Sequence, residues 1–328
     1  MAKIKHEKGV LVEDTVIDPD NNSAKKKNFI ITHAHSDHAK VSKAKEKTFF
    51  MTSETKNLIK TRNTKEFNVK EIPFKKKFSL DSTEFEFFHS GHILGSTQIR
   101  VNGGEIVLTS DFKLTDSVLF DKAEILQAET LVIESTFGSP EYVFPERKKI
   151  YEKIEKWGKQ ELKENKLLVL GGYSIGKAQE LTKLSNKFLD EIPLVHQTIF
   201  EPNKVYEKSG TKLGKFELLN HNLKEFNVLI IPPHLLNPDL ITALEISSGR
   251  KVSSAVFSGW NGFRGTKSFP LSDHADFNQL LKYVKESGAK NVLTNHGFAE
   301  QFASSIRRKL GVNARPLNKS SQSNLLDF

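Results

Sequence analysis

The sequence contains no cysteine, and it has only two methionines and two tryptophans in 328 residues. The absence of cysteine excludes disulfide bonds, a thiol nucleophile and thiolate metal ligands. Any bound metal ion must therefore be held by histidine, aspartate and glutamate. The chain also lacks the run of about 20 apolar residues that crosses a bilayer, and its first residues show no apolar signal-peptide core. We expect a cytoplasmic protein that does not associate with membranes.

The overall composition is that of a globular protein with a basic excess. Hydrophobic residues make up 37% of the chain and charged residues 27%, which suits a substantial core and argues against disorder. Lys and Arg number 49 against 40 Asp and Glu, a net charge of +9. The length suits one large domain or two of ordinary size. The positive charge agrees with a polyanionic partner such as a nucleic acid.

Short apolar, β-branched runs alternate with amphipathic segments along most of the chain, which indicates a layered α/β protein. The spacing predicts helices over 146–164 and 276–287. The predicted buried strands are Phe29–Thr32, Glu105–Thr109, Leu131–Ile133, Leu167–Leu170, Val228–Ile231, Ala255–Phe257 and Asn291–Thr294.

A dense histidine motif, His33-Ala-His-Ser-Asp-His38, follows the first of these strands. Three imidazoles and a carboxylate within six residues are hard to explain by packing, because clustered histidines lose hydration on burial and offer little to a core. They suit divalent metal ions. The motif therefore predicts a metal site at the end of the strand.

Further metal-type side chains lie just beyond other apolar strands. His92 stands in the segment Ser90–Gly95, Asp111 ends the run that begins at Ile106, and His296 follows Asn295. Strand ends on one edge of a sheet converge, so these residues can join the histidine motif in space. One such residue alone would be weak evidence, but several in order strengthen the prediction.

With these residues in order, the sequence resembles the metallo-β-lactamase superfamily, whose motif His-x-His-x-Asp-His is present at His33–His38. The resemblance implies two divalent ions, zinc by preference and manganese as the alternative. Asp18 would hold the metal-binding loop in place without binding a metal ion itself. The alternative is that Asp18 is an ordinary turn aspartate. The implied ligands are His33, His35 and His92 for one ion, Asp37, His38 and His296 for the other, and Asp111 as the bridge.

Three later segments resemble the signatures of the β-CASP nucleases, a branch of that superfamily. They are Leu131–Phe137 with Glu134, Leu271–Asp276 with His274, and Asn295–Gly297. The branch implies a four-layer αββα sandwich interrupted by an α/β cap. We accordingly expect the sandwich at 1–143 and 267–328, and the inserted cap at 144–266.

Within this branch the chain is most similar to the DNA ligase-associated exonuclease family. That resemblance rests on motifs that occur in the expected order, and it suggests a DNA ligase and a helicase as functional companions. The supporting segments are Thr136–Tyr142, Gly172–Gln179, Phe257–Trp260 and Leu271–Asp276.

Hydrolysis of an anionic phosphodiester needs charge neutralisation, a prepared nucleophile and an acid for the departing oxygen. Asp37 belongs to the metal-binding part of this machinery. His274 is the candidate general acid because it is a histidine beyond the metal set, and Glu134 is its candidate partner. The alternative for His274 is a capping histidine outside the reaction.

Substrate contacts are predicted at three kinds of position. Gly171–Gln179 follows a strand and opens a helix, so its backbone N–H groups, Ser174 and Lys177 would suit a phosphate, although a purely structural turn is the alternative. Arg264 is a further candidate. Hydroxyls within the β-CASP signatures complete the set: Ser135, Thr136 and Ser272.

The sequence leaves four functions to compare. A DNA exonuclease acting on single strands or ends in repair is preferred, and an RNA-processing nuclease is the alternative because His296 is typical of RNA-processing members of the branch. A small-molecule hydrolase would need neither the insert nor His274. A metal-free binding module is disfavoured because every expected metal ligand is present.

Overall fold

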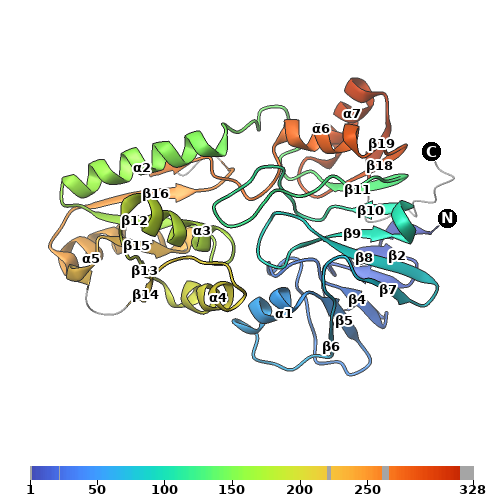
Figure 1. Cartoon of the computed structure of the whole chain (residues 1–328), viewed down its shortest axis with the longest axis horizontal. Helices are drawn as coiled ribbons and strands as arrows, with labels where there is room; N and C mark the ends of the chain where they lie inside the picture. Colours follow the sequence, from blue (N-terminus) through green and yellow to red (C-terminus); the bar gives the residue numbers. More distant parts are fainter. Residues whose placement is uncertain (1, 22, 220–222, 261–265, 318–328) are drawn as a thin grey trace. The chain divides into compact units, whose positions relative to one another are not determined.

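The computed structural model describes residues 2–21, 23–219, 223–260 and 266–317. The chain divides into two compact units. The first unit is formed by Met1–Thr115, Lys122–Val143 and His274–Phe328, and the second by Asp116–Asp121 and Phe144–Asp273. Each unit has its own sheets and helices (Figure 1).

The first unit begins with a six-stranded mixed sheet in the order β1-β2-β3-β4-β5-β6. Its first three strands are antiparallel, and β3, β4, β5 and β6 run parallel. The parallel part places the ends of β3 and β4 at one edge. The strands are β1 (Ile4–His6), β2 (Val10–Val12), β3 (Thr15–Ile17), β4 (Asn28–Ile30), β5 (Thr48–Met51) and β6 (Val69–Glu71).

The second sheet of this unit has seven strands in the order β19-β18-β11-β10-β9-β8-β7. Its β7–β9 half is antiparallel, and β10, β11, β18 and β19 are parallel. Residues 102–104 form a short 3₁₀ turn. The strands are β7 (Lys77–Leu80), β8 (Thr83–His89), β9 (Thr97–Val101), β10 (Ile106–Leu108), β11 (Thr130–Glu134), β18 (Asn291–Asn295) and β19 (Asn313–Pro316).

Alternating side chains place apolar layers on both faces of the second sheet. Val132 of β11 faces the first sheet, in a core that also holds Ile30 and Phe87. Leu131 and Ile133 of the same strand face α6 (Phe277–Glu286) and α7 (Ala299–Leu310). Helix α1 (Ser53–Lys60) lies beside β6 of the first sheet (Figure 1). The unit has the predicted helix–sheet–sheet–helix architecture.

The second unit is built on a wholly parallel sheet in the order β14-β13-β15-β12-β16-β17. Apolar residues of α2, α3 and α4 cover one face, and α5 covers the other. The strands are β12 (Leu167–Gly171), β13 (Leu194–Val195), β14 (Glu217–Leu218), β15 (Val228–Ile231), β16 (Val252–Phe257) and β17 (Lys267–Phe269). The helices are α2 (Arg147–Lys163), α3 (Lys177–Leu184), α4 (Gln197–Lys208) and α5 (Pro238–Ser248), with short turns at Ser185–Leu189, Leu223–Glu225 and Pro233–Leu235.

The local patterns explain these elements. Each predicted strand overlaps a strand of the structure, and the two predicted helices correspond to α2 and α6. The Asp276 side chain caps α6 by accepting a hydrogen bond from Gln279 N at 2.9 Å. Helix α2 buries Ile150, Ile154 and Trp157 as its spacing predicts.

The sheet of the second unit continues past residue 266, where the sequence analysis ended the insert, because β17 pairs with β16. The domain bounds expected from the sequence, 1–143, 144–266 and 267–328, stay a prediction. None of the helices in the described part of the chain combines the length and apolar character that a membrane crossing requires.

Candidate metal centre

Asp18 connects the ends of the parallel strands β3 and β4. Its Oδ1 accepts a hydrogen bond from Thr32 N at 2.8 Å, and its Oδ2 accepts one from the Thr32 hydroxyl at 2.5 Å. The same Oδ2 lies 2.9 Å from His38 Nδ1. Burial alone would raise the pKa of Asp18, but the charge of His38 and the hydrogen bonds from His38 and Thr32 hold it below its usual value. Asp18 therefore anchors both ends of the histidine motif.

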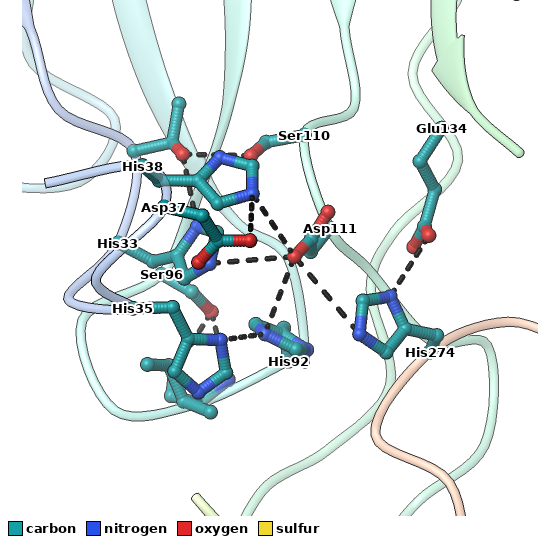
Figure 2. A network of polar contacts seen from close by, with 12 residues as sticks. His33, His35, Asp37, His38, His92, Ser96, Ser110, Asp111, Glu134 and His274 are labelled. Atoms are coloured by element: carbon teal, nitrogen blue, oxygen red, sulfur yellow. Dashed lines mark hydrogen bonds and ion pairs between the residues drawn. The ribbon is translucent and has the colours of Figure 1, made fainter. Parts of the chain in front are cut away.

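Asp111 lies at the centre of the histidines (Figure 2). Its Oδ2 is 3.3 Å from His33 Nε2, 3.5 Å from His38 Nε2 and 3.6 Å from His92 Nε2. His274 Nε2 is 4.0 Å from the same oxygen. Segments that follow β4, β8 and β10 thus bring one carboxylate and several imidazoles together, as the strand-end argument predicts.

The first donor set, His33, His35, His92 and Asp111, fits a divalent ion. His33 Nε2 is buried and makes no hydrogen bond within the described residues. His35 Nδ1 and His92 Nε2 are 3.1 Å apart. Ligand atoms about 2 Å from a tetrahedral ion lie roughly 3.3 Å from one another, so the spacing of these nitrogens suits a shared ion.

The second predicted set is looser. The Asp37 side chain is 79% exposed, with Oδ2 3.7 Å from His38 Nε2. His296 is exposed, and its ring centre lies 5.3 Å from that of His38. Among the described residues, the compact donor set around His38 is completed by Asp18 and His33, and it includes neither Asp37 nor His296. Both side chains nevertheless lie beside His38, and their ligand roles stay predictions.

The environment sets protonation states that suit metal binding. Burial lowers the pKa of His33, and the charge of His38 lowers it further. Burial lowers the pKa of His92 strongly, with His274 and His35 acting in the same direction. Both imidazoles are therefore neutral, which is the state that a metal ligand requires. Although burial would raise the pKa of Asp111, the charges of His38 and His274 hold it well below its usual value.

His38 differs from its neighbours in charge. Burial lowers its pKa, but the carboxylates of Asp111, Asp18 and Asp37 outweigh this and raise it to about 10. A metal ion that binds His38 Nε2 must therefore displace a proton.

His274 and Glu134 form a pair at the edge of the cluster. His274 Nδ1 lies 2.8 Å from Glu134 Oε2, and Glu134 Oε1 accepts a hydrogen bond from Phe112 N at 2.8 Å. Glu134 is buried at the end of β11, whereas 23% of the His274 side chain is exposed. The carboxylate thus holds one ring nitrogen while the other points toward Asp111 (Figure 2). This is the geometry that the predicted roles require.

Arg62 is a candidate that the sequence analysis missed. It follows α1 and is exposed. Desolvation lowers the pKa of its guanidinium, while the nearby Asp37 carboxylate acts in the opposite direction. No hydrogen-bonding or ion-pair partner of its guanidinium is present among the described residues. A free cation beside an exposed metal-site aspartate suits a phosphate oxygen. The position of Arg62 in the sequence relative to the histidine motif gives no signal that would predict this contact.

Of the three hydroxyls predicted to contact substrate within the β-CASP signatures, that of Ser135 has partners in the fold. Ser135 Oγ donates to the carbonyl oxygens of Asn295 at 2.9 Å and His296 at 2.6 Å, which secures the loop that carries His296. Thr136 is half-buried beside it. Ser272 is buried, and its carbonyl accepts a hydrogen bond from Arg147 Nη1 at 2.7 Å. Ser135 and Ser272 are thus tied into the fold.

The segment Gly171–Gln179 has a structural task in the second unit. The side chain of Lys177 is 2% exposed, and its Nζ lies 2.7 Å from Glu180 Oε2 and 2.8 Å from Asp273 Oδ1. The ammonium is therefore engaged by carboxylates, and its contact with a phosphate stays a prediction. Ser174 Oγ lies 3.0 Å from Thr198 Oγ1 near the surface. Arg264 lies outside the described residues.

Known proteins resemble this chain in sequence and in fold. Residues 264–315 match the model of the Zn-dependent metallo-hydrolase RNA specificity domain. A "Probable DNA ligase" of Opitutus terrae is 29% identical over 308 residues, covering 90% of this chain and 29% of that protein. An "RNase J-like protein" of Methanocaldococcus jannaschii is 24% identical over 251 residues, covering 68% of this chain and 60% of that protein.

The chain spans less than two thirds of the length of either relative. A solved structure of a protein of unknown function from Enterococcus faecalis superimposes with a TM-score of 0.61 at 12% identity, covering 92% of this chain and 83% of that one, which is a likeness of fold. Together with the cluster of histidines and Asp111, these matches support the resemblance of the chain to the β-CASP nuclease branch of the metallo-β-lactamase superfamily.

Proposed function

We propose that this chain is a metal-dependent nuclease that hydrolyses phosphodiester bonds of DNA, as an exonuclease on single strands or ends in repair. The observation that carries the proposal is the placement of Asp111 Oδ2 within 3.6 Å of three imidazole nitrogens, with the His274–Glu134 pair beside them. The fold supplies a donor set for metal and a separate histidine for proton transfer.

Two divalent ions, zinc or manganese, suit the ligands, and when bound they would neutralise phosphate charge and supply Lewis acidity. His33, His35 and His92 would hold one ion. The other would be held by Asp37, His38 and His296, with Asp111 shared between them. Asp18 would keep His38 oriented through the contact with Nδ1.

His274 would act as the general acid. Its Nε2 faces the metal cluster and would give a proton to the oxygen that leaves phosphorus. Glu134 accepts the Nδ1 hydrogen and stabilises the protonated ring, so it is a positioning residue that acts through His274. Arg62 would hold a non-bridging phosphate oxygen beside Asp37.

DNA is favoured as the substrate because the relative whose match covers 90% of this chain is named a probable DNA ligase. In that relative the matching part is a fraction of a longer protein, which supports a functional association with a ligase. A helicase companion rests on the family resemblance of the sequence motifs.

RNA is the second candidate. The matched family model is described as an RNA specificity domain, and it covers both His274 and His296. The relative named an RNase J-like protein also favours RNA as the substrate. Hydrolysis of a small molecule is disfavoured, because such a substrate needs neither the second unit nor the His274–Glu134 pair.

A cleavage time course on matched single-stranded DNA and RNA tests the proposal. Each oligonucleotide carries a label at one end and is blocked in turn at either terminus, with zinc, manganese or chelator added. We expect stepwise loss of nucleotides from DNA, restored by metal after chelation. Equal or faster cleavage of RNA would transfer the proposal to RNA, and absence of cleavage in every metal would overturn it.

A further inference from the structure

The parallel sheet of the second unit has a topological switch point between β12 and β15. These neighbouring strands run parallel, yet the chain leaves β12 for α3 on one face of the sheet and leaves β15 for α5 on the opposite face. Where adjacent connections diverge in this way, the loops after the strands separate and open a crevice at the carboxyl edge. Ligands of open α/β sheets bind at such points.

The loops at this edge carry aromatic and imidazole side chains. Tyr173 follows β12 and is 53% exposed, and Trp260 follows the neighbouring β16 and is 38% exposed. His234 is exposed after β15. His196 caps α4 after β13, the strand on the other side of β15. Four consecutive neighbours in the sheet thus each place a ring at one edge.

Hydrogen bonds organise part of this group, which we call the edge cluster: Tyr173, Ser174, His196, Thr198, His234 and Trp260. Thr198 N donates to His196 Nδ1 at 3.3 Å, so the proton of the neutral ring lies on Nε2. The Thr198 hydroxyl contacts both His196 Nδ1 at 2.9 Å and Ser174 Oγ at 3.0 Å. The loops after β12 and β13 are therefore connected.

The edge cluster contains neither lysine nor arginine, and the nearby Lys177 is occupied by Glu180 and Asp273. The backbone N–H groups that open α3 are also partly used, because Gly176 N donates to Gln179 Oε1 and Ala178 N donates to the Tyr173 carbonyl. Within the described part of this edge, phosphate is thus poorly matched. Exposed aromatic faces with hydroxyl and imidazole groups match a nucleobase, which stacks on the ring and hydrogen-bonds at its edge.

We propose that the edge cluster is a binding site for unpaired nucleobases of a single-stranded nucleic acid, with Tyr173 as the stacking platform. The inference rests on the proposed function, since it names how a nuclease that acts on single strands would bind the bases of its substrate. Paired bases in a duplex hide their faces, so the site selects single strands.

The test is binding of a labelled single-stranded oligonucleotide, measured by fluorescence anisotropy in chelator so that no cleavage occurs. Loss of one stacked base predicts a Kd roughly 5- to 100-fold weaker for Tyr173→Ala. Tyr173→Phe keeps the ring and should bind like the parent. Ile246→Ala removes another exposed apolar side chain of the second unit, 78% exposed on α5, and serves as the matched control.

An oligonucleotide of abasic sites separates stacking from other causes. The parent should bind it more weakly than the natural strand, and Tyr173→Ala should lose nothing further. Equal loss on natural and abasic strands, or unchanged binding of Tyr173→Ala, would overturn the inference. Hydrolysis of bis(4-nitrophenyl) phosphate by the parent with added metal tests the proposed function separately, so either proposal can fail while the other stands.

Discussion

His274 Nδ1 lies 2.8 Å from Glu134 Oε2, while His274 Nε2 lies 4.0 Å from Asp111 Oδ2. One imidazole therefore connects the buried carboxylate of Glu134 with the oxygen at the centre of the proposed metal ligands, and Glu134, His274 and Asp111 themselves form a compact donor group. This arrangement gives the ring a fixed tautomer and a fixed direction.

His274→Ala should slow cleavage by roughly 10²–10⁴-fold with metal content retained, which is the usual range for a general acid. Glu134→Gln should give a smaller loss and shift the pH profile of kcat, because the ring loses the charge that favours its protonated form. The measurement is kcat on a labelled oligonucleotide together with metal analysis. A substrate with a much better leaving group should restore the kcat of His274→Ala, because such a group departs without a proton. If kcat stayed low, the acid role of His274 would be excluded.

Asp37→Ala should abolish cleavage and lower the metal content. Its side chain is 79% exposed, so removing it leaves no cavity and should change the free energy of unfolding little. Glu46→Ala, an exposed carboxylate in the loop that follows, is the matched control and should keep both metal and activity. Mass spectrometry measures the metal content of each variant, and thermal melting measures its stability. Full metal occupancy in Asp37→Ala would remove Asp37 from the ligand set.

The part of the site that the sequence predicts is the part that follows from strand topology. His33, Asp111 and His92 come after separate strands, and their convergence needs only the rule that strand ends share an edge. Lys177 shows the limit of that reasoning. Its glycine-rich turn suits a phosphate by local pattern, but its ammonium is taken by Asp273, which lies 96 positions away. Its other partner, Glu180, lies only three positions along the chain, but no local pattern contains the contact with Asp273.

Ser135 illustrates the same limit on a smaller scale. Its place in a signature suggested contact with substrate, whereas its hydroxyl donates to the carbonyls of Asn295 and His296 across 160 and 161 positions. The parallel pairing of β11 with β18 creates that contact. Strand order in a sheet, unlike strand position in the sequence, is not readable from hydrophobic periodicity.

Two tyrosines should make the stability fall at alkaline pH. Burial and the neighbouring Glu180 raise the pKa of Tyr151, and burial raises the pKa of Tyr283, both above the ordinary value of 10.0. Each tyrosine has a higher pKa in the folded chain than in the unfolded chain, so its protonated form favours folding. The stability that these two hydroxyls contribute is complete below pH 10 and is lost as the pH rises above it.

Tyrosinate absorbance, recorded with increasing pH, measures this effect. Tyr151 and Tyr283 should stay protonated in the folded chain until it unfolds. Tyr151→Phe and Tyr283→Phe should each remove one unit of the delayed absorbance and weaken the alkaline loss of stability. Titration of all five tyrosines in one reversible step near pH 10, with the fold intact, would contradict the prediction.

Gly297 and Gly311 form a matched pair for testing the loop that carries His296. Both have a positive φ, +52° and +66°, so alanine is strained at either position by about 1–2 kcal/mol. At Gly297 a Cβ would also lie 2.4 Å from Ser135 O and 2.5 Å from Thr136 Cα, whereas at Gly311 nothing lies within 4 Å.

Gly297→Ala must therefore move backbone, and we expect it to lose about 4 kcal/mol or more in free energy of unfolding, a size reserved for such disruptions. Gly311→Ala should lose only the strain at its own φ. Denaturant unfolding of both variants gives the comparison, and metal content shows whether His296 is displaced when the loop moves. Equal losses for the two variants would mean that the loop yields freely, and that the clamp of Ser135 on the Asn295 and His296 carbonyls does not hold His296 in place.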